Sequence, residues 1–144
     1  MADNYRVTAK RTGTSSTVLH DNKEFFNACY IGGYVVECCQ KLLLESVTNA
    51  GTWNYHELDD LQRDYRTKLH VLKRSKHAKA SQLAKLNLLI EIDKVFKTIF
   101  DTWHPKYRYD DAHGWDETTS QKYQQEIAGA QKIIARLHVN GFIK

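Results

Sequence analysis

The amino-acid sequence predicts an all-helical fold, a four-helix bundle with a flexible arm at its N-terminus. Three observations predict it. Pro105 is the only proline among the 144 residues, long stretches contain no glycine, and apolar residues recur at helical spacing without strand-like alternation. A chain of this length can bury one hydrophobic core but not two, so we expect a single domain.

The N-terminal arm and the first helix differ clearly in composition. Residues 1–19 are rich in serine and threonine without a sustained apolar period, which predicts a flexible arm, so the helical domain should span 20–144. Asp21 and Glu24 form a helix start signal, and the first helix is predicted over about 22–47. Its regularly spaced residues are Phe26, Tyr30, Gly33, Glu37, Lys41 and Leu44.

Two further helices follow from the same spacing rule. Asn54 and Glu57 have the separation of a capping box, and the second helix is predicted over about 55–72. The third is predicted over about 80–103, ending before Pro105. The apolar face of the second helix is formed by Leu58, Leu61, Tyr65 and Leu69. That of the third is formed by Leu89, Ile92, Phe96, Ile99 and Trp103.

The fourth helix should begin at a cap formed by Thr118 and Gln121 and end just before Gly141. Its face consists of Tyr123, Ile127, Ala130, Ile134 and Leu137, separated by steps of four, three, four and three. One apolar stripe on each of four helices is typical of a helical bundle.

Composition excludes several functional classes. No apolar run approaches the roughly 18 residues of a membrane span, and no secretory signal is evident, so we expect a cytoplasmic protein.

The three cysteines Cys29, Cys38 and Cys39 fall in one predicted helix, and we expect reduced, buried thiols. Histidines and cysteines lack the usual ligand spacings, and no phosphate-binding glycine loop is present, so we expect neither a metal nor a cofactor.

Charge is concentrated in one stretch of the chain. Residues 63–79 carry seven lysines and arginines against one acid, a local charge of +6, whereas the whole chain has +4. Such a basic stripe is the usual electrostatic signature of phosphate binding, and the alternative is a solvated helix face. The candidate nucleic-acid- or nucleotide-binding residues of the stripe are Lys73, Arg74, Lys76 and Lys79.

A polar cluster interrupts the apolar first helix. Glu37 lies three residues after Tyr34 and four before Lys41, which places a phenol, a carboxylate and an ammonium along one helix face. Buried polar groups need partners. The cluster is therefore interpreted either as an internal ion pair that ties this helix to a neighbour or as a nucleotide or interface contact.

Several motifs together resemble the HEPN domains (higher eukaryotes and prokaryotes nucleotide-binding). They are "ACYIGGYVVECCQKLLLE" in the first helix, "NYHELDDLQ" at the start of the second, "KYRYDD", and "EIAGAQKIIARL" in the last helix. The similarity covers about residues 20–138. It implies a helical bundle that commonly forms a homodimer. It also implies one of two functions: a metal-independent ribonuclease site, or binding of a nucleotide or partner without catalysis.

The catalytic branch of that family carries an arginine followed, after four to six residues, by a histidine. Arg108 and His113 match this spacing within "PKYRYDDAHGWD". A histidine can accept the proton of an RNA 2′-hydroxyl while a guanidinium holds the phosphorane, so no metal is needed. Tyr109 follows the arginine where catalytic members carry a polar residue, and it is a candidate nucleotide contact.

Three functions therefore remain open. The first is a candidate endoribonuclease of a toxin–antitoxin or defence system. The second is an accessory module that binds a nucleotide or a partner protein, such as a nucleotidyltransferase or antitoxin. The third is a purely structural dimerisation domain.

Overall fold

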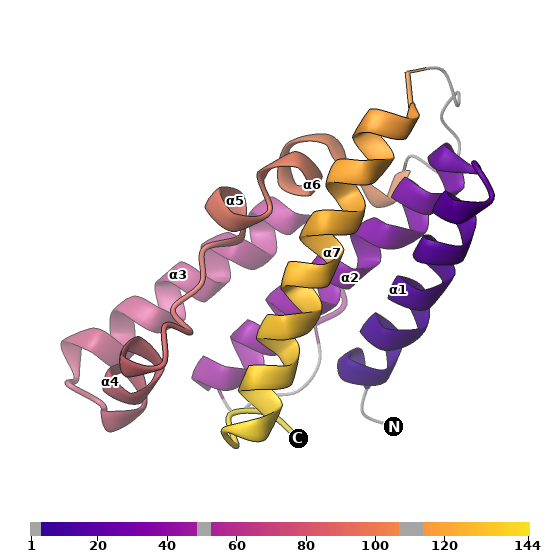
Figure 1. Cartoon of the computed structure of the whole chain (residues 1–144). Coiled ribbons are helices and arrows are strands. Elements are labelled where there is room, and N and C mark those ends of the chain that lie inside the picture. Colours follow the sequence, from indigo (N-terminus) through magenta and orange to yellow (C-terminus); the bar gives the residue numbers. More distant parts are fainter. Residues whose placement is uncertain (1–3, 49–52, 107–113) are drawn as a thin grey trace.

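The computed structural model describes residues 4–48, 53–106 and 114–144, and within these ranges it is helical without any strand, as predicted (Figure 1). The helices are α1 (Tyr5–Asp21), α2 (Phe25–Thr48), α3 (Leu58–Arg74), α4 (Ala78–Lys85), α5 (Ile92–Val95), α6 (Lys97–Thr102) and α7 (Glu117–Val139). Of the helices in these ranges, none is both long and apolar enough to cross a lipid bilayer.

Helix α2 is the central element of the fold. It packs against α1, α3 and α7, and most of its residues are buried, so it contributes more to the core than any other helix described. Figure 1 shows α1 and α3 on either side of α2, with α4 at the far end of α3. Helix α1 also packs against α7. Among the described residues, four long helices, α1, α2, α3 and α7, are therefore combined with three short ones.

Residues 5–19 were expected to belong to a flexible arm, and this expectation is wrong. They lie in α1, whose N-cap Asn4 accepts a hydrogen bond from the Val7 amide at 3.0 Å. The helix buries Tyr5, Ala9, Gly13 and Ser16, at steps of four, four and three. Three of these four residues are small, so the buried face carries no stripe of large apolar side chains.

Ser16 shows how a polar residue can serve in such an interface. Its hydroxyl donates to the Ala28 carbonyl at 2.7 Å and accepts from Gln124 Nε2 at 2.8 Å, which links α1 to both α2 and α7. Ser16 is fully buried, and these bonds satisfy its hydroxyl.

The predicted third helix over 80–103 is instead interrupted between α4 and α5, and again between α5 and α6. Asn87 has a φ of 55°, a left-handed conformation that asparagine tolerates better than most residues. The Leu88 amide then bonds to the Leu83 carbonyl at 2.8 Å, closing the end of α4. The apolar face survives this break, because Ile92, Phe96, Ile99 and Trp103 are all buried.

Helix starts differ from their predicted positions by a few residues. Helix α3 begins at Leu58, after Glu57, and the capping box expected from Asn54 is not formed, since Glu57 is the N-cap and makes no side-chain cap bond. Helix α7 begins after Asp116, whose carboxylate accepts from the Thr119 amide at 2.8 Å, instead of at the predicted Thr118 cap. Asp21 does not start α2, because it is the last residue of α1.

The three cysteines are free and buried. Burial raises the pKa of both the Cys29 and the Cys38 thiol to about 12, and it also raises the pKa of Cys39. Thiols protonated at neutral pH are poor nucleophiles, so these residues act as small core side chains.

Gly33 allows the Trp103 indole to lie directly on the backbone of α2. A Cβ atom at position 33 would lie 2.1 Å from the indole Cδ1 and Nε1 atoms, and the indole is held by a 2.9 Å hydrogen bond from Nε1 to the Tyr30 carbonyl. The ring cannot simply rotate away without losing that bond.

We therefore expect Gly33→Ala to reduce the free energy of unfolding by about 1–3 kcal/mol, the usual cost of overpacking, despite the higher helix propensity of alanine. Gly129→Ala in α7 is the matched control, because a Cβ there meets one Phe96 ring atom at 3.2 Å. Urea denaturation of both variants measures the difference. Equal stability of the two variants would contradict this account of Gly33.

Candidate nucleic-acid interface

The basic stretch predicted to bind phosphate forms the corner between α3 and α4. Lys73 and Arg74 occupy the last turn of α3, where positive side chains interact favourably with the helix dipole. Lys76 lies in the turn with a φ of 51°. His77 caps α4, and its Nδ1 atom accepts from the Lys79 amide at 3.1 Å.

Acidic residues pair with Arg63 and Arg66, the two arginines in the first part of the basic stretch. Arg63 pairs with Asp60 at 3.1 Å. Arg66 pairs with Glu91 at 3.2 Å and with Asp93 at 2.9 Å, both from the segment that follows α4. These two guanidinium groups therefore serve the fold, and they are less suited to binding a phosphate.

The second part of the stretch keeps its positive charge. Within the described ranges, Lys68, Lys73, Arg74 and Lys76 are exposed and have no carboxylate partner within ion-pair distance. Three of these four are among the predicted binding residues. Lys79, the fourth predicted residue, is half-buried at the start of α4. Three of the four exposed cations, Lys73, Arg74 and Lys76, thus lie at the α3–α4 corner.

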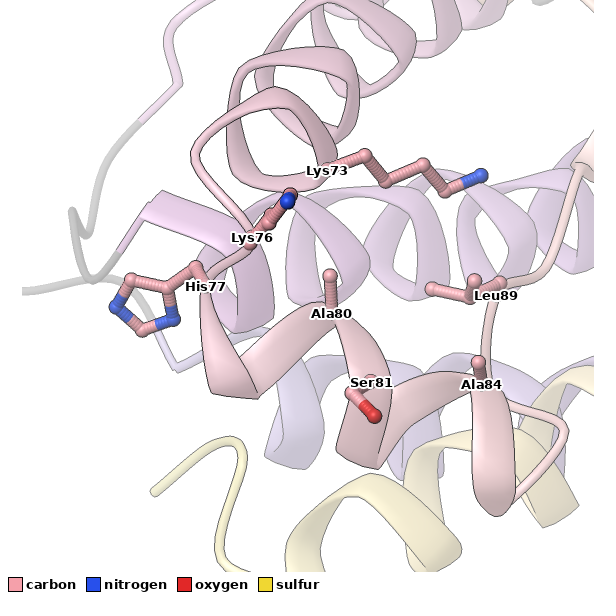
Figure 2. A pocket seen from close by; sticks show the side chains of 7 residues that line it. All are labelled: Lys73, Lys76, His77, Ala80, Ser81, Ala84 and Leu89. Atoms are coloured by element: carbon pink, nitrogen blue, oxygen red, sulfur yellow. The ribbon is translucent and has the colours of Figure 1, made fainter.

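A hollow of about 330 Å³ lies at this corner (Figure 2). Its lining residues are Lys73, Lys76, His77, Ala80, Ser81, Ala84 and Leu89. Figure 2 shows the Lys73 side chain extended above α4, while Ala80 and Leu89 lie below it and the His77 ring is turned outward. The surface therefore combines ammonium groups with a floor of small and aliphatic side chains.

Two of the binding residues predicted from the sequence, Lys73 and Lys76, line the hollow. The other polar residues that line it were not predicted. Arg74 and Lys79 do not line it, although both lie beside it in the chain. His77 and Ser81 do line it, and neither was among the predicted residues. Their separation of four, from the cap into the first helical turn of α4, was the signal that could have identified them.

The three residues of the predicted polar cluster in α2 do not act together: Glu37 and Lys41 form an ion pair, whereas Tyr34 contacts aromatic residues. Lys41 Nζ lies 2.8 Å from Glu37 Oε1, and His56 Nδ1 lies 2.8 Å from the same oxygen. The Lys41 ammonium also lies 5.1 Å from the centre of the Tyr5 ring, a cation–π contact with α1. Since Glu37 and Lys41 are only 4% and 3% exposed, this ion pair connects α2 to its neighbours and is not open to a ligand.

Tyr34, the third member of the cluster, contacts aromatic residues. Its hydroxyl lies 3.0 Å from that of Tyr30, and its ring packs edge-on against Trp103 with centroids 4.9 Å apart. Together with Gly33, these rings hold the end of α6 against α2.

The candidate catalytic residues Arg108 and His113, together with Tyr109, lie outside the described residues. The chain on both sides of 107–113 is anchored on the N-terminal half of α2. Trp103 is bonded to the Tyr30 carbonyl, and Trp115 packs edge-on against Phe26 at a centroid distance of 6.0 Å.

Across residues 4–48, 53–106 and 114–144, no three histidine, cysteine, aspartate or glutamate side chains come together as a metal ion requires.

The chain matches no family model, no curated protein and no solved structure. The segments "ACYIGGYVVECCQKLLLE" and "EIAGAQKIIARL" lie in α2 and α7, where the sequence predicted helices. Membership of the HEPN family stays a prediction.

Proposed function

We propose that this chain is a HEPN-like helical domain that binds the phosphates of RNA or nucleotides at the α3–α4 corner. The observation that carries the proposal is the set of exposed cations around the hollow, Lys73, Arg74 and Lys76, which have no carboxylate partner in the described part of the chain. The neighbouring arginines Arg63 and Arg66 do have such partners. A helix corner that retains its positive charge is suited to a phosphate backbone.

The lining of the hollow supports a phosphate ligand. Lysine ammonium groups attract phosphate as point charges, and the Ser81 hydroxyl can donate a hydrogen bond. The turn also leads into the N-terminus of α4, where the helix dipole favours negative charge. A volume of about 330 Å³ is at the small end of ligand pockets, which fits one phosphate-bearing unit of a longer strand.

Neutralising the corner should reduce the salt dependence of RNA binding. We expect the double substitution Lys73→Gln and Lys76→Gln to weaken binding of a fluorescein-labelled single-stranded RNA. It should also lower the slope of log K against log salt by about 1.4, because each phosphate contact contributes about 0.7. Fluorescence anisotropy over a series of salt concentrations measures both quantities.

The matched control is Lys23→Gln with Lys122→Gln, two exposed lysines, one in the connection between α1 and α2 and one near the start of α7. It removes the same net charge and should leave the slope nearly unchanged. If the two double variants bind alike at every salt concentration, the α3–α4 corner is a solvated face and not the interface.

A metal-independent endoribonuclease is the second candidate function. It is favoured by the spacing of Arg108 and His113 in the sequence. If the chain is an endoribonuclease, the α3–α4 corner holds the RNA strand and a second copy of the chain completes the active site. The protein would then belong to a toxin or defence system, with an antitoxin or a nucleotidyltransferase as its partner. Without cleavage, the same surfaces serve a non-catalytic accessory module.

A further inference from the structure

A second surface, which shares no lining residue with the α3–α4 corner, has the character of a protein-docking site. Two hollows lie between α1 and α7, with volumes of about 580 and 250 Å³. They adjoin each other at Thr14 and Gln131, which line both, and we call the two hollows together the α1–α7 groove. Its residues are Arg6, Val7, Ala9, Lys10, Gly13, Thr14, Thr17, Val18, Gln131, Ile134, Ala135, His138 and Val139.

The groove exposes large aliphatic side chains along its edges. Val7 and Val18 on α1 are 51% and 53% exposed, and Val139 on α7 is 81% exposed. Its floor contains the buried residues Ala9 and Ile134. Three of the five large hydrophobic residues exposed in the described ranges therefore gather along this one groove. Covering such a surface with apolar side chains is favourable.

The charged side chains that line the groove are positive. They are Arg6 and Lys10, and no aspartate or glutamate is among the described lining residues; Arg6 Nε also donates a 3.4 Å hydrogen bond to the Lys144 carbonyl oxygen. Lys10 has no ion-pair partner within the described part of the chain. A second copy of the same groove would bring like charges together, so charge complementarity favours a different, acidic surface.

The shape and chemistry of the lining favour a helix over a nucleic acid. From Val7 to Val18 the groove follows eleven residues of α1, about 16 Å, or three helical turns. Apart from the His138 imidazole, its lining contains no aromatic ring on which a base could stack. Hollows with aliphatic edges that follow three turns of a helix are typical of helix-in-groove recognition.

We propose that the α1–α7 groove docks an amphipathic helix of a partner protein, with aliphatic residues at positions i, i+4, i+7 and i+11 and glutamates or aspartates on its flanks. The aliphatic residues cover the space between Val7, Val18 and Val139, and the carboxylates pair with Lys10 and Arg6 at the groove edge. This proposal does not depend on the α3–α4 corner, because the two surfaces share no lining residue.

The test uses two synthetic helical peptides that carry leucine at those four positions, one with glutamates on its flanks and one with lysines in their place. We expect the acidic peptide to bind the full chain and the basic peptide to bind at least about tenfold more weakly. Lys10→Glu should weaken binding of the acidic peptide by a similar factor. Ala135→Gln, which places a larger side chain in the groove, should also weaken its binding. Lys132→Glu, on α7 but outside the groove, is the control.

Several results would overturn the proposal. These are failure of the acidic peptide to bind, equal binding of the two peptides, an unchanged affinity in Lys10→Glu, or displacement of the peptide by RNA. Sedimentation in which Ala135→Gln converts a dimer to a monomer would assign the groove to a second copy of the chain. The double substitution of Lys73 and Lys76 should leave peptide binding intact, so failure of the RNA proposal is distinguishable from failure of this one.

Discussion

RNA cleavage is expected to fall by about 100- to 1000-fold when either His113 or Arg108 is replaced by alanine, the usual cost of removing one catalytic group. The imidazole is expected to accept the 2′-hydroxyl proton, and the guanidinium is expected to stabilise the phosphorane. Neither group can replace the other, so both losses should be severe. Gel analysis of a labelled RNA incubated with purified wild type and each variant measures the rates.

Arg108→Lys separates geometry from charge. A lysine keeps the positive charge but loses the planar pair of donors that a guanidinium offers to two phosphate oxygens. A catalytic arginine should therefore be impaired by this change, whereas a merely basic residue should tolerate it. Circular dichroism of each variant should match wild type.

Two further conditions define the activity. Cleavage should persist in the presence of a chelator, because imidazole and guanidinium perform the proposed chemistry without a metal. A DNA strand of the same sequence should remain intact, because it lacks the attacking 2′-hydroxyl. If purified wild type leaves RNA intact with and without divalent ions, or if the double alanine variant cleaves at the wild-type rate, the accessory-module function takes the place of the nuclease.

The parts of the fold that the sequence could predict are those whose buried faces carry large apolar residues. Helices α2, α3 and α7 were expected within a few residues of their observed bounds, because Leu61, Tyr65 and similar side chains repeat at helical spacing. Helix α1 was missed because it packs through Ala9, Gly13 and Ser16. Hydrophobic periodicity gives little signal when close approach of two helices depends on small residues.

The break after α4 could not be read from composition either. The run from Leu83 to Phe100 keeps apolar residues on one side throughout, and only the left-handed conformation of Asn87 ends α4 within it. Asparagine at a helix end is a common but weak signal, because the same residue also occurs within helices.

Prediction of the candidate site depended on contacts that are distant in sequence. The stripe of cations was evident from composition. The residues that neutralise Arg66, however, are Glu91 and Asp93, which follow α4 in the chain. Only the folded chain shows that this arginine is paired while Lys73 and Lys76 face the hollow. Local charge therefore predicted the region, and tertiary ion pairs decided which cations remain available.

The largest stability effect should come from the buried ion pair of α2. Replacing Lys41 by methionine keeps the length of the side chain but leaves the Glu37 carboxylate buried without its ammonium partner. Glu37 Oε2 has no hydrogen-bond partner among the described residues, and after the substitution Oε1 keeps only the contact with His56 Nδ1 at 2.8 Å, whose side chain is 53% exposed. Removing one member of a buried pair typically costs about 3–5 kcal/mol, and we expect the free energy of unfolding in urea to fall by that amount.

Two comparisons show whether burial is the cause. Lys97→Met removes the ammonium of the Lys97–Asp101 pair, which has the same i,i+4 spacing and a distance of 2.7 Å, but whose side chains are 74% and 47% exposed. Because water screens that pair, its loss should barely change stability. The double variant Glu37→Leu with Lys41→Met removes both buried charges, so it should recover most of the loss caused by Lys41→Met alone. If the double variant is as unstable as the single one, the damage comes from lost contacts of the lysine, such as that with the Tyr5 ring, and not from an unpaired buried carboxylate.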